Sequence, residues 1–238
     1  GTAIDRSKVI ITLKDSTGNA TTVGADGSFK AMAETYTYTI NAAGYRYTTG
    51  SVTVTAENKE FTVSMQSAPT GTWDGITITE PQKDGDVYVV KTGAELAWLS
   101  AKVADKTLNK FSAKLANDID LGDYPWTAIN TTGSSYVFTL DGAGHTISGL
   151  NAVMGLFGTV GGASEIKDVT VSGVLNTAEG SVGGIVNYLQ SGKISGCVSN
   201  VAVTVTGSGK TNIGGIAGYM GNNAQIVNCV NRGTVTAE

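Results

Sequence analysis

A repeated pattern over residues 155–238 constrains the fold of this chain more than any other feature of its sequence. The segment GLFG at 155–158 returns as GGIVN at 183–187 and as GGIAG at 214–218. About twelve residues after each copy comes a second apolar mark, at Ile166, Ile194 and Ile226. Repeats of this length, built of short apolar strands and Gly/Asn turns, predict stacked units that cannot fold alone.

Each repeat predicts one coil of a parallel β-helix. Valines at 201, 203 and 205 alternate with Ala202 and Thr204, which puts one face inward and the other toward solvent. Equivalent residues of successive coils should stack at the spacing of about 4.8 Å between strands. We therefore expect two inward ladders, one of Leu156, Ile185 and Ile216 and one of Ile166, Ile194 and Ile226. Crossovers between parallel strands favour a right-handed helix.

The motif G-G-I-[VA]-[GN] followed by I-x-[GN]-C-x-[SN] resembles the GLUG-type repeats of large bacterial surface proteins. The stretches 113–121, 126–129 and 138–150 resemble the lead-in of such arrays, so the resemblance covers residues 73–238. Asn187 departs from it, because the family usually has a second glycine there. The resemblance implies an elongated, adhesin-like segment of a longer multidomain chain, secreted or anchored to the bacterial cell wall, and implies no chemistry.

The first 66 residues predict a separate small β-sandwich. Short alternating strands are expected at 9–13 and 36–40, followed by a hairpin of 51–55 and 60–65. The VIITL strand, DGSF, YTYTINAAGY and FTVSM resemble the carboxypeptidase-regulatory-like, or transthyretin-like, domain. That resemblance implies an accessory module without catalytic residues. Residues 67–72 are small and polar and predict a linker.

One helix is predicted, at about 92–104, at the start of the second domain. Thr92 and Glu95 form a capping-box pattern, and Leu96, Leu99 and Val103 fall on one face. A β-helix has an open end with unpaired edges, so we expect this helix to cap the N-terminal end. The predicted architecture is all-β: a small β-sandwich, then a right-handed parallel β-helix with an N-terminal capping helix.

Composition excludes several classes of function. The 238 residues carry a net charge of −4, and only 15% are charged, so we expect neither nucleic acid nor an anionic membrane as a partner. No apolar run is long enough to cross a membrane. Cys197 and Cys229 hold equivalent places in consecutive repeats, where parallel side chains favour buried free thiols over a disulfide. Two cysteines without a nearby histidine predict no metal site, and no cofactor motif is present.

Catalysis by a polysaccharide-active enzyme is the least favoured interpretation. Such an enzyme needs clustered carboxylates, and the best cluster is Asp118, Asp120 and Asp141 with His145, the single histidine. Asp118 and Asp120 alternate with Ile119 and Leu121, however, which is typical of the solvent face of a strand. We therefore expect no enzyme.

Carbohydrate binding is the stronger alternative, because exposed aromatic rings stack on sugars. Four aromatic residues are the candidate ligand contacts: Tyr124, Trp126, Tyr188 and Tyr219. Tyr188 and Tyr219 follow equivalent turns, so they are also consistent with a purely structural cross-coil pair. The sequence favours first a non-enzymatic stalk or adhesion module that meets a host or microbial surface ligand, and second a glycan-binding module.

Overall fold

The computed structural model describes residues 9–57, 60–129, 136–178, 180–206 and 212–237. The chain divides into two compact units, Gly1–Thr70 and Gly71–Glu238. Their boundary falls inside the segment 67–72, which the sequence predicts as a linker. Each unit is described by itself.

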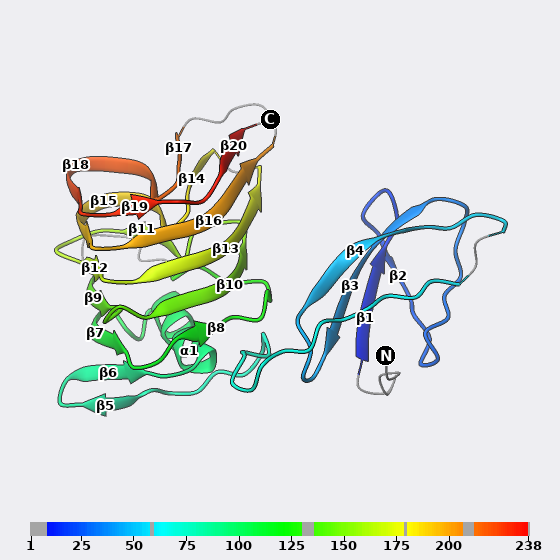
Figure 1. Ribbon diagram of the computed structural model, residues 1–238, viewed down its shortest axis with the longest axis horizontal. Coiled ribbons are helices and arrows are strands. Elements are labelled where there is room, and N and C mark those ends of the chain that lie inside the picture. The colour runs from blue at the N-terminus through cyan, green and yellow to red at the C-terminus, as the bar shows by residue number, and fades with distance from the viewer. Residues whose placement is uncertain (1–8, 58–59, 130–135, 179, 207–211, 238) are drawn as a thin grey trace. The chain divides into compact units, whose positions relative to one another are not determined.

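The first unit contains one antiparallel sheet of four strands in the order β2-β1-β3-β4 (Figure 1). The strands are β1 (Val9–Lys14), β2 (Ala20–Thr21), β3 (Thr35–Ala42) and β4 (Thr48–Thr53). One face carries the buried side chains of Leu13, Tyr36 and Ile40, while Thr35, Thr37 and Thr39 of β3 and Thr49 and Thr53 of β4 lie on the other. This alternation is what a half-buried sheet requires.

The second sheet of the predicted sandwich is not formed by the described residues. The segment 60–65, expected as a strand paired with 51–55, has no strand assignment. Its burial still alternates, because Phe61, Val63 and Met65 are half-buried and the residues between them are exposed. The segment therefore covers the sheet through side chains without joining a hydrogen-bonded ladder, and the hairpin prediction is wrong.

The second unit is a β-solenoid of about five turns, and Figure 1 shows its strands stacked in successive layers. It begins with β5 (Gln82–Asp84), β6 (Val87–Val90), α1 (Gly93–Ala104), β7 (Lys110–Leu115), β8 (Ile119–Asp120), β9 (Val137–Asp141) and β10 (Thr146–Ala152). It continues with β11 (Phe157–Val160), β12 (Glu165–Lys167), β13 (Thr170–Thr177), β14 (Ser181–Gly183), β15 (Val186–Ser195) and β16 (Val198–Val205). The last coil contains β17 (Asn212–Gly214), β18 (Ala217–Val227), β19 (Val230–Asn231) and β20 (Val235–Ala237).

Three sheets form the sides of the solenoid. The first has the order β5-β6-β7-β9-β12-β15, with β11 and β18 also paired to β15. The second runs from β8 through β10, β13 and β16 to β19 and β20, and the third is the pair β14-β17. Among the described residues of this unit, every strand pair is parallel except β5-β6, as coils that wind in one direction require.

The predicted inward ladders are present. Ile166 lies opposite Ile194, and Ile194 lies opposite Ile226. Leu156 and Ile185 of the other ladder are fully buried, and the Ile185 N–H donates to the carbonyl of Ile216. Three phenylalanines add a stack that the sequence pattern did not indicate, since the rings of Phe111, Phe138 and Phe157 follow one another at 5.2 and 5.4 Å between centroids.

Each of the last three coils turns the same corner through one residue in the left-handed region. These residues are Asp168, Gly196 and Asn228, with φ of 52°, 62° and 54°. All three belong to the residue types that adopt this conformation most readily. Each is followed by Val169, Cys197 or Cys229 and then by a strand of the second sheet, so the corner recurs once per coil at a fixed place.

The predicted helix is α1, and its capping box is formed as predicted. The Thr92 side chain accepts a hydrogen bond from the Glu95 N–H, and the Glu95 carboxylate accepts from the Thr92 N–H. Leu96, Leu99 and Val103 are buried. The helix connects the parallel neighbours β6 and β7, at the end of the stack that also holds β8 (Figure 1). Its role as a cap and the right-handed sense of the solenoid stay predictions.

Candidate functional site

An exposed pair of tyrosines on the first sheet is the best candidate for a binding surface. Tyr188 on β15 lies directly opposite Tyr219 on β18, as the repeat spacing predicts. Their ring centroids are 6.1 Å apart at an interplanar angle of 47°. The two residues are 38% and 43% exposed, so both rings offer apolar surface to solvent. In the preceding coil, Thr159 of β11 lies directly opposite Tyr188.

The other two predicted contact residues, Tyr124 and Trp126, are in the core. They are 4% and 6% exposed, and Trp73 meets both edge to face, at 6.4 and 5.6 Å between centroids. The Trp126 indole N–H donates to the carbonyl of Leu156. The expectation that these rings are exposed is therefore wrong, because Trp73 covers them from a segment fifty residues away in sequence.

The carboxylates of the weighed enzyme cluster are engaged in structural contacts. His145 Nδ1 lies 3.1 Å from Asp118 Oδ1, and the Thr146 N–H donates to the same oxygen at 2.9 Å. These hydrogen bonds, that from Thr146 first, lower the pKa of Asp118. Asp120 accepts from the Gly122 N–H at 2.9 Å and from the Thr72 hydroxyl at 3.1 Å.

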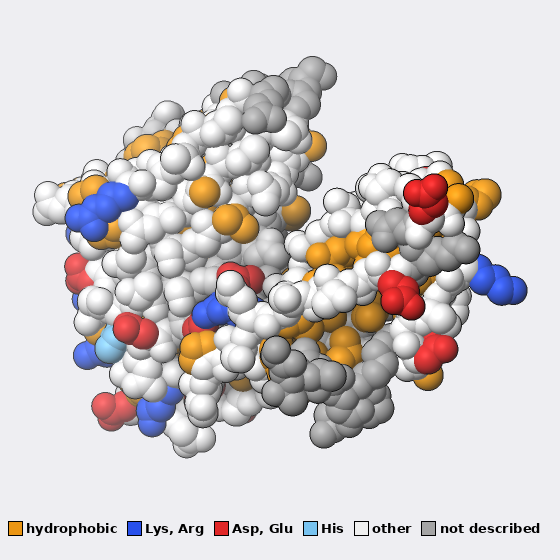
Figure 2. Space-filling view, turned by 45° about the vertical axis from the view of Figure 1, so that its right-hand side comes forward, with side chains coloured by type: hydrophobic (Ala, Val, Ile, Leu, Met, Phe, Trp, Pro, Cys, Tyr) orange, Lys and Arg blue, Asp and Glu red, His pale blue; other side chains and the backbone are white. Residues whose placement is uncertain are grey.

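Asp141 belongs to a different contact set. Its Oδ1 accepts from the Ala143 N–H at 2.8 Å, and its Oδ2 lies 3.1 Å from Lys167 Nζ. Burial acts to raise its pKa, but the Ala143 hydrogen bond and the lysine outweigh burial and leave the pKa below its usual value. His145, the pale blue side chain in Figure 2, thus meets one carboxylate of the cluster by hydrogen bond rather than two. A paired acid and base is not formed by these contacts.

Two ion pairs join neighbouring coils on the solvent face of the first sheet. Lys167 of β12 lies opposite Asp141 of β9, and Lys193 of β15 lies opposite Glu165 of β12. The Lys193 and Glu165 charges are 3.1 Å apart. Because opposite charges meet only in this register, the pairs favour one stacking of the coils over its neighbours.

Both cysteines are free thiols, as predicted. Cys197 is fully buried, and burial raises its pKa to about 12. Its N–H donates to the sulfur of Cys229 at 3.3 Å. Cys229 lies in the last coil and is partly exposed. A raised pKa is the opposite of what activates a thiol as a nucleophile, so Cys197 is a core residue rather than a reactive one.

Asn187 is a buried polar residue whose role the sequence did not reveal. Its side chain is 1% exposed, and its Oδ1 accepts from the Gly155 N–H at 2.9 Å and from the Gly183 N–H at 3.3 Å. Glycines 158 and 218 hold the same place in the adjacent coils. Asn187 therefore ties the turn of its own coil to the turn of the coil before it.

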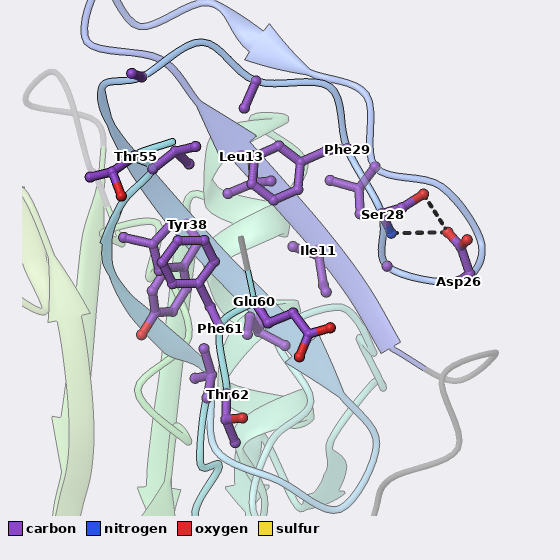
Figure 3. A pocket seen from close by; sticks show the side chains of 18 of the residues that line it. Ile11, Leu13, Asp26, Ser28, Phe29, Tyr38, Thr55, Glu60, Phe61 and Thr62 are labelled. Atoms are coloured by element: carbon purple, nitrogen blue, oxygen red, sulfur yellow. Dashed lines mark hydrogen bonds between the residues drawn. The ribbon is translucent and has the colours of Figure 1, made fainter. Parts of the chain in front are cut away.

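The first unit contains an apolar hollow of about 910 Å³ beneath its sheet (Figure 3). Ile11 and Leu13 of β1 and Tyr38 of β3 line one side, and Phe29 and Phe61 of the covering segments line another. Asp26 is at the rim, where its carboxylate accepts from the N–H and hydroxyl of Ser28. This set of side chains provides apolar volume and no paired acid and base.

Over the described ranges, no three His, Cys, Asp or Glu side chains gather in a way that could hold a metal ion. In the same part of the chain, no helix combines the length and apolar character that crossing a membrane needs.

Comparison with known proteins finds a distant sequence similarity. The chain is similar to halomucin of Haloquadratum walsbyi (strain DSM 16790 / HBSQ001), with 28% identity over 248 residues. The alignment covers 91% of this chain and 3% of halomucin, so the chain spans a small fraction of the relative's length. No family model matches the chain, and no solved structure matches it significantly. The GLUG-type and carboxypeptidase-regulatory-like resemblances stay predictions, as does a bacterial origin.

Proposed function

We propose that this chain is a non-enzymatic module of a secreted or wall-anchored surface protein, in which the solenoid acts as a stalk or adhesive surface. The observation that carries the proposal is the continuous inward ladder, in which Ile166 and Ile194 are fully buried between successive coils. A core of this kind becomes larger only when coils are added. It therefore produces an elongated module rather than an enclosed binding cavity. Similarity to a protein named halomucin fits a role at a surface.

The engaged carboxylates support the non-enzymatic part of the proposal. Asp118 and Asp141 are held by backbone N–H groups and by His145 or Lys167. A general acid needs a raised pKa near neutrality, whereas both carboxyls have lowered pKa values. Their contacts favour structural roles.

Surface display can be tested with antibodies raised against the 238-residue chain. Intact cells of the source organism should bind the antibody, and external protease should remove the signal while a cytoplasmic marker survives. Labelling that requires permeabilised cells would contradict the proposal.

A second function, glycan binding, is favoured by the exposed pair Tyr188 and Tyr219. Two tyrosines at 6.1 Å present neighbouring faces on which sugar rings can stack. The test is a glycan array with the full chain, a Tyr188→Ala/Tyr219→Ala variant and a Val174→Ala control. Val174 is a similarly exposed apolar residue on a different sheet. Binding should be lost in the tyrosine variant alone, with unchanged circular dichroism.

Two outcomes would separate the pair's roles. Binding that survives the double substitution would contradict a glycan site at the tyrosines. If the wild-type chain binds no glycan and the double variant melts at a lower temperature, the tyrosine pair is a structural contact. An aromatic pair of this kind should stabilise the fold by about 0.5–1.5 kcal/mol beyond the effect of its buried area.

A further inference from the structure

Tyr188 and Tyr219 are exposed because they lie on the outer face of the first sheet. Tyr188 has a neighbouring coil on each side, since it lies opposite Thr159 of β11 and opposite Tyr219 of β18. It is nevertheless 38% exposed, whereas the next residue, Leu189, is fully buried. The outward direction of the side chain therefore exposes the ring, and adjacent coils do not cover it. Tyr219 holds the same outward place one coil further on.

The two rings follow one another along the axis of the solenoid. Tyr188 and Tyr219 are opposite residues of parallel strands in successive coils, so the line that joins them crosses the strands. The ring centroids are 6.1 Å apart, which is close to the length of one pyranose unit in a polysaccharide. A sugar chain that lies along this line places two of its rings over the two tyrosines.

The tilt between the rings selects the form of the ligand. Their planes meet at 47°, so the pair does not present one flat surface to a crystalline polysaccharide. A single chain, in which successive sugar rings are rotated about the chain axis, can contact both tyrosines. Each sugar ring must also have an apolar face, because that face packs on an aromatic ring. Hexopyranoses joined through equatorial bonds, as in β-glucans, meet both requirements.

The surroundings of the pair carry no charge. The segments of β11, β18 and the start of β15 lie in three stretches without Asp, Glu, Lys, Arg or His: 154–164, 180–192 and 212–231. The next charged residue along β15 is Lys193, roughly 16 Å from Tyr188 at about 3.3 Å per residue. Its charge is paired with Glu165 at 3.1 Å. That separation exceeds the screening length of about 10 Å at 0.1 M salt, so these strands offer an anionic ligand no cation near the rings.

We propose that the tyrosine pair binds a single neutral chain of equatorially linked hexopyranoses, which lies across the coils along the solenoid axis. The proposal rests on the glycan binding proposed above and adds the class of glycan and its direction. An anionic glycan is disfavoured because its carboxylates lose hydration at the rings without gaining an ion pair. A monosaccharide is disfavoured because one sugar ring covers one tyrosine only.

The experiment compares neutral and anionic hexamers of the same length on the full chain. Cellohexaose and laminarihexaose are the neutral probes, and hexamannuronate carries one carboxylate on each ring. Calorimetry gives the dissociation constants, and magnetic resonance of ring-labelled tyrosine identifies the rings that respond. An open surface covers one face of the ligand, so we expect a dissociation constant of about 1 mM for at least one neutral hexamer. Hexamannuronate should bind roughly tenfold more weakly or less, and added salt should not change the neutral affinity.

Two variants and a control connect this binding to the pair. Tyr188→Ala and Tyr219→Ala should each weaken the binding of the neutral hexamer roughly tenfold. Lys193→Gln removes a charge further along the same strand, and it should leave both affinities unchanged. If an alanine variant unfolds, the wild-type spectra replace it as the test, because the ring signals of Tyr188 and Tyr219 must shift when the neutral hexamer is added.

The outcomes separate this inference from glycan binding itself. Neutral hexamers that need both tyrosines and ignore Lys193→Gln would support it. Hexamannuronate that binds as tightly as the neutral hexamers, or binding to crystalline cellulose without binding to a hexamer, would overturn it and leave glycan binding standing. If no hexamer binds while the glycan array finds another ligand at the tyrosines, this inference alone fails. If the array is also blank, both fail.

Discussion

Replacing Asn187 by alanine tests how the turns of adjacent coils are joined. In Asn187→Ala the Gly155 and Gly183 N–H groups lose their shared acceptor inside the protein. A buried donor left unsatisfied costs about 1–3 kcal/mol. Because the Gly183 bond is the longer one, at 3.3 Å, we expect a total loss of about 2–5 kcal/mol in the free energy of unfolding. For a chain of this size, that corresponds to a fall in melting temperature of about 5–15 °C.

Thermal melting followed by circular dichroism measures this loss on the full chain. The matched control is Asn200→Ala, which removes an exposed asparagine from β16 and should stay within about 0.5 kcal/mol of the wild type. Amide hydrogen exchange identifies the cause, because Gly155 and Gly183 should lose protection in Asn187→Ala and keep it in the control. Equal melting temperatures for the two variants, with both amides still protected, would refute the reasoning.

Two further predictions concern the left-handed corner at Gly196 and the ion pair between Asp141 and Lys167. Gly196→Ala should lower stability by about 1–3 kcal/mol, because its φ of +62° disfavours a side chain and a Cβ there would lie 2.2 Å from Asp168 Oδ1. Adding Asp168→Gly should restore part of the loss in urea melts, and no loss at all would contradict the corner argument. The pKa of Asp141 in the folded chain lies below its ordinary value of 3.8, so the stability that Asp141 contributes is present above pH 3.8 and disappears as pH falls through the folded pKa. Asp141→Asn should therefore flatten the decline of melting temperature below about pH 4, and an unchanged decline would count against the ion pair.

The solenoid was predictable because its signal repeats. Ile166, Ile194 and Ile226 stack in the predicted ladder, and Tyr188 meets Tyr219 as the spacing requires. A repeat supplies its own register, since each coil defines where the next one lies. Capping of α1 was predictable for a different reason, because the contact between Thr92 and Glu95 is local.

The failures arise where partners are distant in sequence. Trp73 buries Tyr124 and Trp126, and the sequence around Pro125 does not indicate that Trp73 is their partner. An alternating pattern was nevertheless available, since Tyr124 and Trp126 flank an exposed Pro125 as inward residues of a strand-like segment do. In 60–65 the alternation matches the half-burial of Phe61, Val63 and Met65, but periodicity does not say whether a strand edge is free to pair.

Asn187 marks a third limit. Its position matches Gly158 and Gly218 in the repeat, so pattern alone indicated only a different turn. The hydrogen bonds to Gly155 and Gly183 depend on the neighbouring coil, and a single repeat does not contain that information. Buried polar contacts of this kind require the stacked structure to be seen.

The parallel stacking of coils has a mechanical consequence. The backbone hydrogen bonds between β15 and β18 run along the axis of the solenoid, so tension along that axis loads every layer in series. Each layer then bears the full force, and the layer with the weakest support opens first. A pulled molecule should therefore lengthen in steps of one coil.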